Sequence, residues 1–316
     1  MTDTGILAVE HTPVVPALPA GACDCHTHVF SAGFAFDPAR SYTPGQASVE
    51  DLLALQARLG LQRVVIVQPS PYGTDNACTL DAVRRLGDRA RAVAVVDPGL
   101  GDAALRAMHA GGVRGVRINL ETGGVSDPVQ AGALLRQAAD QVAGLGWHVQ
   151  TYTNLRMIGA LHQVMAALPC PLVIDHFGRA MAEGGVAQPG FDALLDLVRS
   201  GKAFVKLSAA HRIAADPDDA QPIATALIAA NPTRMLWGSD WPHPGGSPAT
   251  RDLGGSPATR DLGGSPASRD PAGIEPFTPT DDGAALNRLR RWTDAETFAS
   301  ILVANPARLY GFPPIG

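Results

Sequence analysis

Histidine and aspartate side chains stand at positions in this sequence where they could do acid–base or metal chemistry together. His26 and His28 are separated by one residue, while His176 and Asp240 each follow a short apolar run. Two adjacent imidazoles can bind a divalent metal ion or donate hydrogen bonds to a developing oxyanion. A carboxylate beside them can take a proton from water. If the fold brings these four side chains together, the sequence predicts a functional site.

The histidine pair lies in a segment that predicts a β-strand. Alternate side chains of a strand share a face, so we expect His26 and His28 to point the same way. Cys23, Cys25 and Thr27 would then point the other way. We therefore expect the two cysteines to pack against helices and not to bind a metal.

Three arginines stand at the ends of other predicted strands, although the chain has a net charge of −5. A guanidinium group can bind a carboxylate through two parallel hydrogen bonds. Arg117, Arg179 and Arg212 are therefore candidates for holding an acidic substrate. The alternative is that they form internal ion pairs, for example Arg117 with Glu121 or Asp97.

The elements that would position these groups are short apolar runs alternating with amphipathic stretches. Near-continuous apolar runs are typical of parallel strands buried on both faces. The predicted strands are Ala22–His28, Arg63–Gln68, Ala92–Asp97, Val113–Asn119, Trp147–Tyr152, Leu172–Asp175, Ala203–Leu207 and Met235–Ser239, and helical patterns between them include Val49–Leu59, Asp102–Ala110, Gly132–Ala143, Leu155–Ala167 and Phe191–Val198. Eight such units predict an α/β fold, a single-domain (β/α)8 TIM barrel, whose functional sites lie at the C-terminal ends of the strands. A doubly wound open sheet is the alternative, but no G-x-G-x-x-G follows an early strand.

Two segments stand outside the barrel pattern. Residues 1–20 form an expected N-terminal arm with prolines at 13, 16 and 19, and the barrel is expected over 21–316. Residues 245–270 repeat a nine-residue unit rich in Gly, Ser and Pro, which opposes regular structure. We interpret the repeat as an insertion after the eighth strand, acting either as a lid or as an inert duplication.

Composition narrows the class of protein. The acidic net charge argues against a nucleic-acid partner, and the sequence has no uncharged apolar run of about 18 residues that would span a membrane. The first 20 residues lack a signal-peptide pattern, and four cysteines do not make a disulfide scaffold. We therefore expect a soluble, cytoplasmic protein whose oligomeric state the sequence leaves open.

Three ordered blocks around the candidate residues resemble the amidohydrolase superfamily. They are Asp24-x-His26-x-His28, the block 173–179 (VIDHFGR) and the block 236–243 (LWGSDWPH). Within the superfamily, the likeness is greatest to the lactonase branch typified by 2-pyrone-4,6-dicarboxylate hydrolase. It extends over residues 21–311 and includes the blocks 67–76, 95–98, 112–119, 146–149 and 305–310.

The resemblance implies roles for the polar cluster. Asp240 would be the general base, and His26, His28 and His176 would orient the attacking water or stabilise the oxyanion. In many amidohydrolases these four residues hold a zinc ion, aided by a histidine at the end of strand five. Tyr152 stands at that place here, as a tyrosine does in the lactonase branch, so the resemblance implies that no cofactor is required. A single divalent metal such as zinc is the alternative.

The resemblance also implies substrate contacts. Arg117, Arg179 and Arg212 match arginines that bind the substrate carboxylates, and Ser70 and Tyr152 match further contacts. The resemblance therefore implies that the partner is a small anionic lactone or carboxylic acid.

One segment departs from the lactonase pattern. Residues 120–124 read LETGG where the lactonase carries a further basic pair. This difference suggests a substrate with fewer negative charges, or one with hydroxyl groups. We therefore expect a hydrolase that opens the lactone ring of a carboxylate-bearing substrate. The alternatives are a metal-dependent decarboxylase of the same superfamily, a lactone isomerase and a non-catalytic binder.

Overall fold

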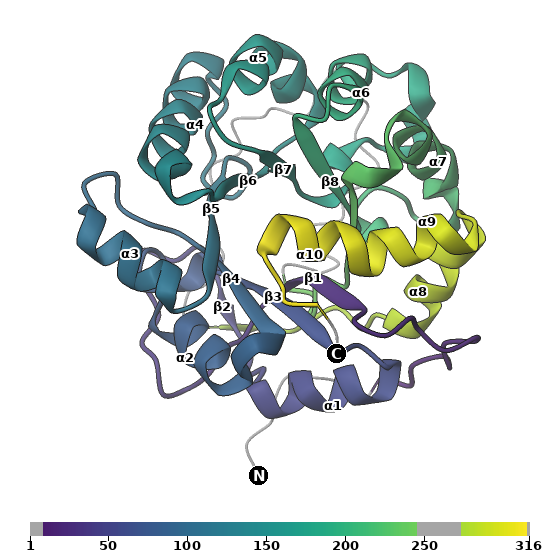
Figure 1. The fold of residues 1–316 in the computed structure, drawn as a ribbon, viewed down its shortest axis with the longest axis horizontal. Helices are drawn as coiled ribbons and strands as arrows, with labels where there is room; N and C mark the ends of the chain where they lie inside the picture. Colours follow the sequence, from purple (N-terminus) through teal and green to yellow (C-terminus); the bar gives the residue numbers. More distant parts are fainter. Residues whose placement is uncertain (1–8, 245–272, 315–316) are drawn as a thin grey trace.

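A ring of parallel strands organises this protein, and Figure 1 shows the ring with helices around its outside. The computed structural model describes residues 9–244 and 273–314. Eight strands form one parallel sheet in chain order: β1 (Cys23–Thr27), β3 (Arg63–Val67), β4 (Ala90–Ala94), β5 (Val113–Asn119), β6 (His148–Tyr152), β7 (Leu172–Ile174), β8 (Ala203–Ser208) and β9 (Met235–Gly238). The predicted α/β fold, a single-domain (β/α)8 TIM barrel, is confirmed.

The first and last strands close the ring. Asp240 N–H donates to the carbonyl of His26 at 2.9 Å, and His28 N–H donates to the carbonyl of Trp241 at 2.8 Å. The Asp24 carboxylate adds a third link, because its Oδ1 accepts from Ser239 N–H at 3.0 Å. The backbone that joins β1 to the end of β9 therefore carries two of the predicted catalytic histidines and the predicted base.

Helices fill the connections between the strands. They are α1 (Val49–Leu59), α2 (Ala77–Leu86), α3 (Asp102–Ala110), α4 (Pro128–Val142), α5 (Leu155–Ala167), α6 (Phe191–Arg199), α7 (Gln221–Ala230), α8 (Asp282–Arg291), α9 (Ala295–Ala299) and α10 (Asn305–Tyr310). α1, α3 and α5 have the bounds that the sequence predicts. α4 begins earlier than predicted, because Asp127 caps it by accepting from the N–H groups of Val129 and Gln130. In the described part of the chain, no helix has the length and apolar content needed to span a bilayer.

The strand β4 lies earlier than the predicted Ala92–Asp97. The backbone beyond it bonds to a side chain instead of a neighbouring strand. Asn76 accepts from Val95 N–H at 3.0 Å and donates to the Val95 carbonyl at 2.7 Å. These two bonds satisfy the peptide groups that would otherwise have continued the strand.

The ring encloses its own core, and this corrects the predicted orientation of the cysteines. Cys23 and Cys25 pack with Val65 and Leu236 in a cluster separate from the one shared by strands and helices. Both cysteines therefore face the barrel interior and not the helices. The cause is an irregularity in the β1–β3 register between Asp24 and Thr27, which breaks the strict alternation of side chains.

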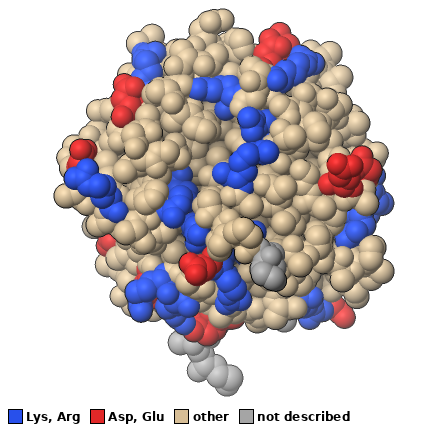
Figure 2. All heavy atoms as spheres, viewed as in Figure 1, with Lys and Arg blue, Asp and Glu red and all other residues tan. Residues whose placement is uncertain are grey.

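The C-terminal segment covers one end of the interior. Figure 1 views the barrel from this end, where α10 crosses the ring, and Figure 2 shows more basic than acidic side chains on the same face. Tyr310 and Phe312 complete the interior cluster. Arg63 donates to the carbonyl of Pro313, and Arg91 donates to that of Gly311 at 3.1 Å.

The segments predicted to lie outside the barrel are only partly described. Residues 9–20 contain no helix or strand and lie against α8. Thr12 N–H donates to Asp281 at 2.9 Å, and Asn287 donates to the carbonyl of Pro13 at 2.9 Å. Two short strands, β2 (Thr43–Pro44) and β10 (Ile274–Glu275), pair with each other in a separate sheet. The predicted repeat insertion at 245–270 lies outside the described residues.

The ring closure generates a stability prediction at Gly238. A Cβ atom at this position would lie 2.7 Å from His26 Cβ and 2.9 Å from His26 N. We expect Gly238→Ala to force β1 and β9 apart and to lower the free energy of unfolding by about 1–3 kcal/mol. Urea denaturation followed by circular dichroism measures this change. Gly99→Ala is the control, because nothing lies within 4 Å of its added Cβ, and equal stability of both variants would contradict the prediction.

Candidate active site

Four side chains meet at the C-terminal end of the barrel. The Nε2 atoms of His26, His28 and His176 each lie 3.6 Å from Oδ1 of Asp240. All four residues are buried. His26 belongs to β1, His28 and His176 follow β1 and β7, and Asp240 follows β9. The structure thus brings together the four side chains that the sequence singled out.

Backbone and side-chain contacts orient two of these imidazoles. His28 Nδ1 lies 2.8 Å from the carbonyl of Val67, so this nitrogen carries the proton in neutral His28. His176 Nδ1 lies 2.8 Å from Oγ of Ser208. In both residues, the contact made by Nδ1 turns Nε2 toward Asp240.

His26 stands above a buried ionic network. Its Nδ1 lies 3.2 Å from Nζ of Lys206 and 3.3 Å from Oδ1 of Asp175. Lys206 also donates to Gln150 at 2.7 Å, and all three partners are fully buried. The two neighbours favour opposite tautomers. A bond from Lys206 leaves the proton on Nε2, whereas a bond to Asp175 leaves Nε2 with a free lone pair.

The surroundings of His26 and His176 favour the neutral forms of these two residues. Burial lowers the pKa of His26 well below its ordinary value, and the Lys206 ammonium lowers it further. Burial lowers the pKa of His176 to about 4, against the opposing effect of Asp240. A neutral imidazole has one ring nitrogen that can donate a proton and one that can accept a proton.

Arg212 holds the carboxylate of Asp240. Its Nε and Nη2 donate to Oδ2 of Asp240 at 3.0 and 2.7 Å, and Nη2 also donates to the carbonyl of Pro244 at 2.7 Å. Burial alone would raise the pKa of Asp240, but Arg212 and His176 bring it well below the ordinary value. Asp240 has a φ of 71°, a strained conformation for a residue with a side chain, as is common at functional sites. The contacts with Arg212 leave Oδ1 turned toward the histidines.

The other two arginines also contact acids. Arg117 is buried with its Nε 3.6 Å from Oδ2 of Asp175, and its Nη1 donates to the carbonyl of Gln68 at 3.4 Å. Arg179 donates to Glu121. The ion-pairing alternative is therefore found in the structure for each arginine, but the partner of Arg117 is neither Glu121 nor Asp97.

Ser70 and Tyr152 each contact side chains at or just after the ends of strands. Ser70 Oγ accepts from Asn119 at 3.1 Å. The Tyr152 ring meets the His176 ring edge-on, with centroids 5.2 Å apart, and the Arg179 guanidinium lies 5.9 Å from the Tyr152 centroid. Tyr152 thus stands between the histidine cluster and Arg179.

The cluster fits a single divalent metal ion. Ligand atoms of His26, His176 and Asp240 all lie within 4.8 Å of one another. The buried Nε2 of His26 has no hydrogen-bond partner among the described residues. Tetrahedral zinc with bonds of about 2.0–2.1 Å separates its ligands by roughly 3.3 Å, close to the 3.6 Å between each Nε2 and Oδ1. Imidazole and carboxylate are ligands that zinc prefers.

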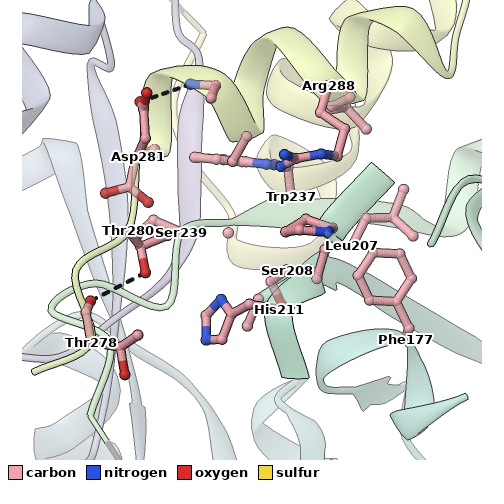
Figure 3. A pocket seen from close by; sticks show the side chains of 18 of the residues that line it. Phe177, Leu207, Ser208, His211, Trp237, Ser239, Thr278, Thr280, Asp281 and Arg288 are labelled. Atoms are coloured by element: carbon pink, nitrogen blue, oxygen red, sulfur yellow. Dashed lines mark hydrogen bonds between the residues drawn. The ribbon is translucent and has the colours of Figure 1, made fainter. Parts of the chain in front are cut away.

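Figure 3 shows a cavity of about 630 Å³ that is lined by residues next to the cluster in sequence or in space, among them Ser208 and Ser239. Side chains at the ends of β8 and β9 line it on one side, and residues around the start of α8 line it on the other. His26, His28, His176 and Asp240 are not among the lining residues, but Ser208, the partner of His176, is. The cavity therefore adjoins the histidine cluster without containing it.

Several residues that support the site were not among the predicted site residues. Gln150 and Ser208 contact Lys206 and His176, and Glu121 contacts Arg179. A polar residue within a buried strand was the available signal for Gln150 and Ser208. No sequence pattern indicated that Glu121 would pair with Arg179.

A model of the amidohydrolase family matches residues 23–312, which include every predicted site residue. The chain belongs to the amidohydrolase family. This amidohydrolase is 36% identical over 313 residues to a 4-sulfomuconolactone hydrolase of Rhizobium radiobacter, covering 95% of this chain and 93% of the relative. It is 38% identical over 241 residues to a 2-pyrone-4,6-dicarboxylate hydrolase of Comamonas testosteroni, covering 72% and 78%. A solved structure of a putative 2-pyrone-4,6-dicarboxylic acid hydrolase from Pseudomonas putida superposes with a TM-score of 0.73 at 30% identity, covering 94% of this chain and 100% of that one.

The buried network of this amidohydrolase generates a stability prediction. Lys206→Met removes a cation 3.5 Å from Asp175 and the donor to Gln150. We expect the free energy of unfolding to fall by about 3–5 kcal/mol, because a buried carboxylate loses a charge partner. Urea denaturation measures the loss. Asp175→Asn and the double variant complete the cycle: the double variant should lose less stability than the sum of the single variants, and additive losses would contradict the coupling.

Proposed function

We propose that this amidohydrolase hydrolyses the lactone ring of a small, carboxylate-bearing substrate, with Asp240 as the general base. The convergence of three imidazole Nε2 atoms on Oδ1 of Asp240, each at 3.6 Å, carries the proposal. Two relatives with at least 36% identity are named as lactone hydrolases, which supports the same reaction class.

Asp240 acts through Oδ1, because Arg212 occupies Oδ2. Oδ1 takes a proton from water, and the resulting hydroxide attacks the ring carbonyl. The tetrahedral intermediate then collapses by breaking the ring C–O bond. Asp240 returns its proton to the departing alkoxide, so the carboxylate is ready for a second cycle.

The histidines have different roles in this mechanism. His28 donates through Nδ1 to Val67, so its neutral Nε2 accepts a hydrogen bond from the attacking water and orients it. His26 carries its proton on Nε2 when Lys206 donates to Nδ1, and in that form it donates to the developing oxyanion. His176 lies 3.6 Å from Asp240 and completes the cluster around the water.

Arginines at the strand ends contact the substrate in this proposal, with Arg117 and Arg212 at its carboxylate and Arg179 at its other polar groups. Arg117, Arg179 and Arg212 surround the cluster, and Ser70 and Tyr152 provide further contacts. A guanidinium group has five N–H donors. Arg212 uses Nε and Nη2 on Asp240, so Nη1 is left to bind a substrate.

We propose that the reaction requires no metal ion. Tyr152 stands where metal-dependent members of the superfamily carry a histidine, which supports this view. If a divalent ion such as zinc binds, His26, His28, His176 and Asp240 would hold it. A bound zinc would lower the pKa of its water and polarise the carbonyl.

Replacing the base tests the mechanism. Asp240→Asn keeps the size of the side chain but removes its ability to take a proton at neutral pH. We expect kcat for lactone opening to fall by about 10²–10⁴-fold, with substrate binding retained. Steady-state kinetics with 2-pyrone-4,6-dicarboxylate and related lactones measure the first quantity, and isothermal titration calorimetry measures the second.

Asp219→Asn is the matched control, because Asp219 is an exposed aspartate outside the site. It should leave kcat unchanged. A wild-type rate in Asp240→Asn would contradict the role of the base.

Running the assay in ¹⁸O-labelled water distinguishes the reaction classes, since hydrolysis places one labelled oxygen in the product and isomerisation places none.

Removal of metal tests whether the site works unaided. We expect lactone hydrolysis to survive exhaustive treatment with a chelator, with metal content followed by mass spectrometry. Activity that disappears with about one zinc per chain, and returns on zinc addition, would overturn the metal-independent mechanism. His26, His28, His176 and Asp240 would then be assigned as ligands.

A further inference from the structure

Glu121 occupies a defined position at the edge of the candidate site. One oxygen of its carboxylate accepts from Nη1 of Arg179, and the other accepts from Nδ2 of Asn154 at 2.6 Å. Its backbone N–H donates to the carbonyl of Tyr152 at 3.3 Å. Hydrogen bonds of the Glu121 backbone and of its side chain therefore hold the carboxylate against Arg179.

The Glu121–Arg179 pair is close to the reacting groups and accessible. The Arg179 guanidinium lies 5.9 Å from the Tyr152 ring centroid, and that ring contacts His176. The Arg179 and Glu121 side chains are 34% and 19% exposed. A substrate bound beside Tyr152 would meet both charges of the pair.

The other cations of the site are also matched by acids. Arg212 pairs with Asp240, while Arg117 and Lys206 share Asp175. With Arg179 and Glu121, these contacts join four cations to three carboxylates. These seven side chains therefore carry a net charge of +1. The excess positive charge lies at Arg117 and Lys206, which share one carboxylate, and not at Arg179.

We propose that Glu121 determines substrate specificity by neutralising Arg179. The substrate is then a lactone with one carboxylate, which the excess positive charge near Arg117 attracts. A second anionic group would approach the Glu121–Arg179 pair, where the Glu121 carboxylate repels it. Neutral polar groups, such as hydroxyls, can bond to either member of the pair. This inference rests on the proposed lactone hydrolysis and names the substrate class of that same site.

The test compares two lactones that differ by one charge: 2-pyrone-6-carboxylate and 2-pyrone-4,6-dicarboxylate. We expect the wild-type enzyme to have the higher kcat/KM for the monocarboxylate. Glu121→Gln removes the negative charge and frees Arg179 to bind a second carboxylate. We expect it to shift the ratio of the two kcat/KM values toward the dicarboxylate by roughly tenfold or more, with a smaller shift at high salt.

Two variants serve as controls. Glu121→Asp keeps the charge and should keep the wild-type ratio, although its shorter side chain can lower both rates. Glu183→Gln removes an exposed acid from the 3-10 helix Ala182–Ala187 and should leave both rates unchanged. Because the readout is a ratio within one variant, partial loss of folded enzyme does not alter it.

The outcomes separate this inference from the proposed function. An unchanged ratio in Glu121→Gln, or a wild-type preference for the dicarboxylate, would overturn the role of Glu121 while leaving lactone hydrolysis intact. Failure of the wild-type enzyme to open either these lactones or any other would overturn the proposed function itself.

Discussion

Closure of the ring between its first and last strands is the constraint on which the site depends. The hydrogen bonds that join β1 to the end of β9 involve the backbones of His26, His28 and Asp240 themselves. Backbone pairing therefore fixes the positions from which the His26, His28 and Asp240 side chains reach one another. Such rigidity suits a reaction whose groups must be held in place before the substrate arrives.

Buried charge accompanies this geometry. Asp175 lies between Lys206, Arg117 and His26, inside a barrel whose other end is filled with apolar side chains. Charges taken out of water are costly unless they are paired, and each of these has an opposite partner. The interior thus changes from an apolar core at one end to an ionic network directly beneath the histidines.

The sequence predicted the fold and the four clustered residues well, because these follow from local patterns. Apolar runs mark the strands, and the barrel brings strand ends together whatever the details of packing. The orientation of Cys23 and Cys25 was wrong, because one irregularity in register lies beyond a simple alternation rule. The partners of Arg117 and Arg179 depend on side-chain reach between different strands. Glu121 precedes Arg179 by 58 residues, so only the folded chain places them in contact.

The contacts of the C-terminal segment determine how well the barrel interior excludes water. Tyr310 and Phe312 belong to the interior cluster, and Arg63 and Arg91 bond to carbonyls of residues 311 and 313. The segment therefore acts as a hydrophobic plug. Without it, water would enter the apolar cluster from the end of the barrel that faces away from the histidines.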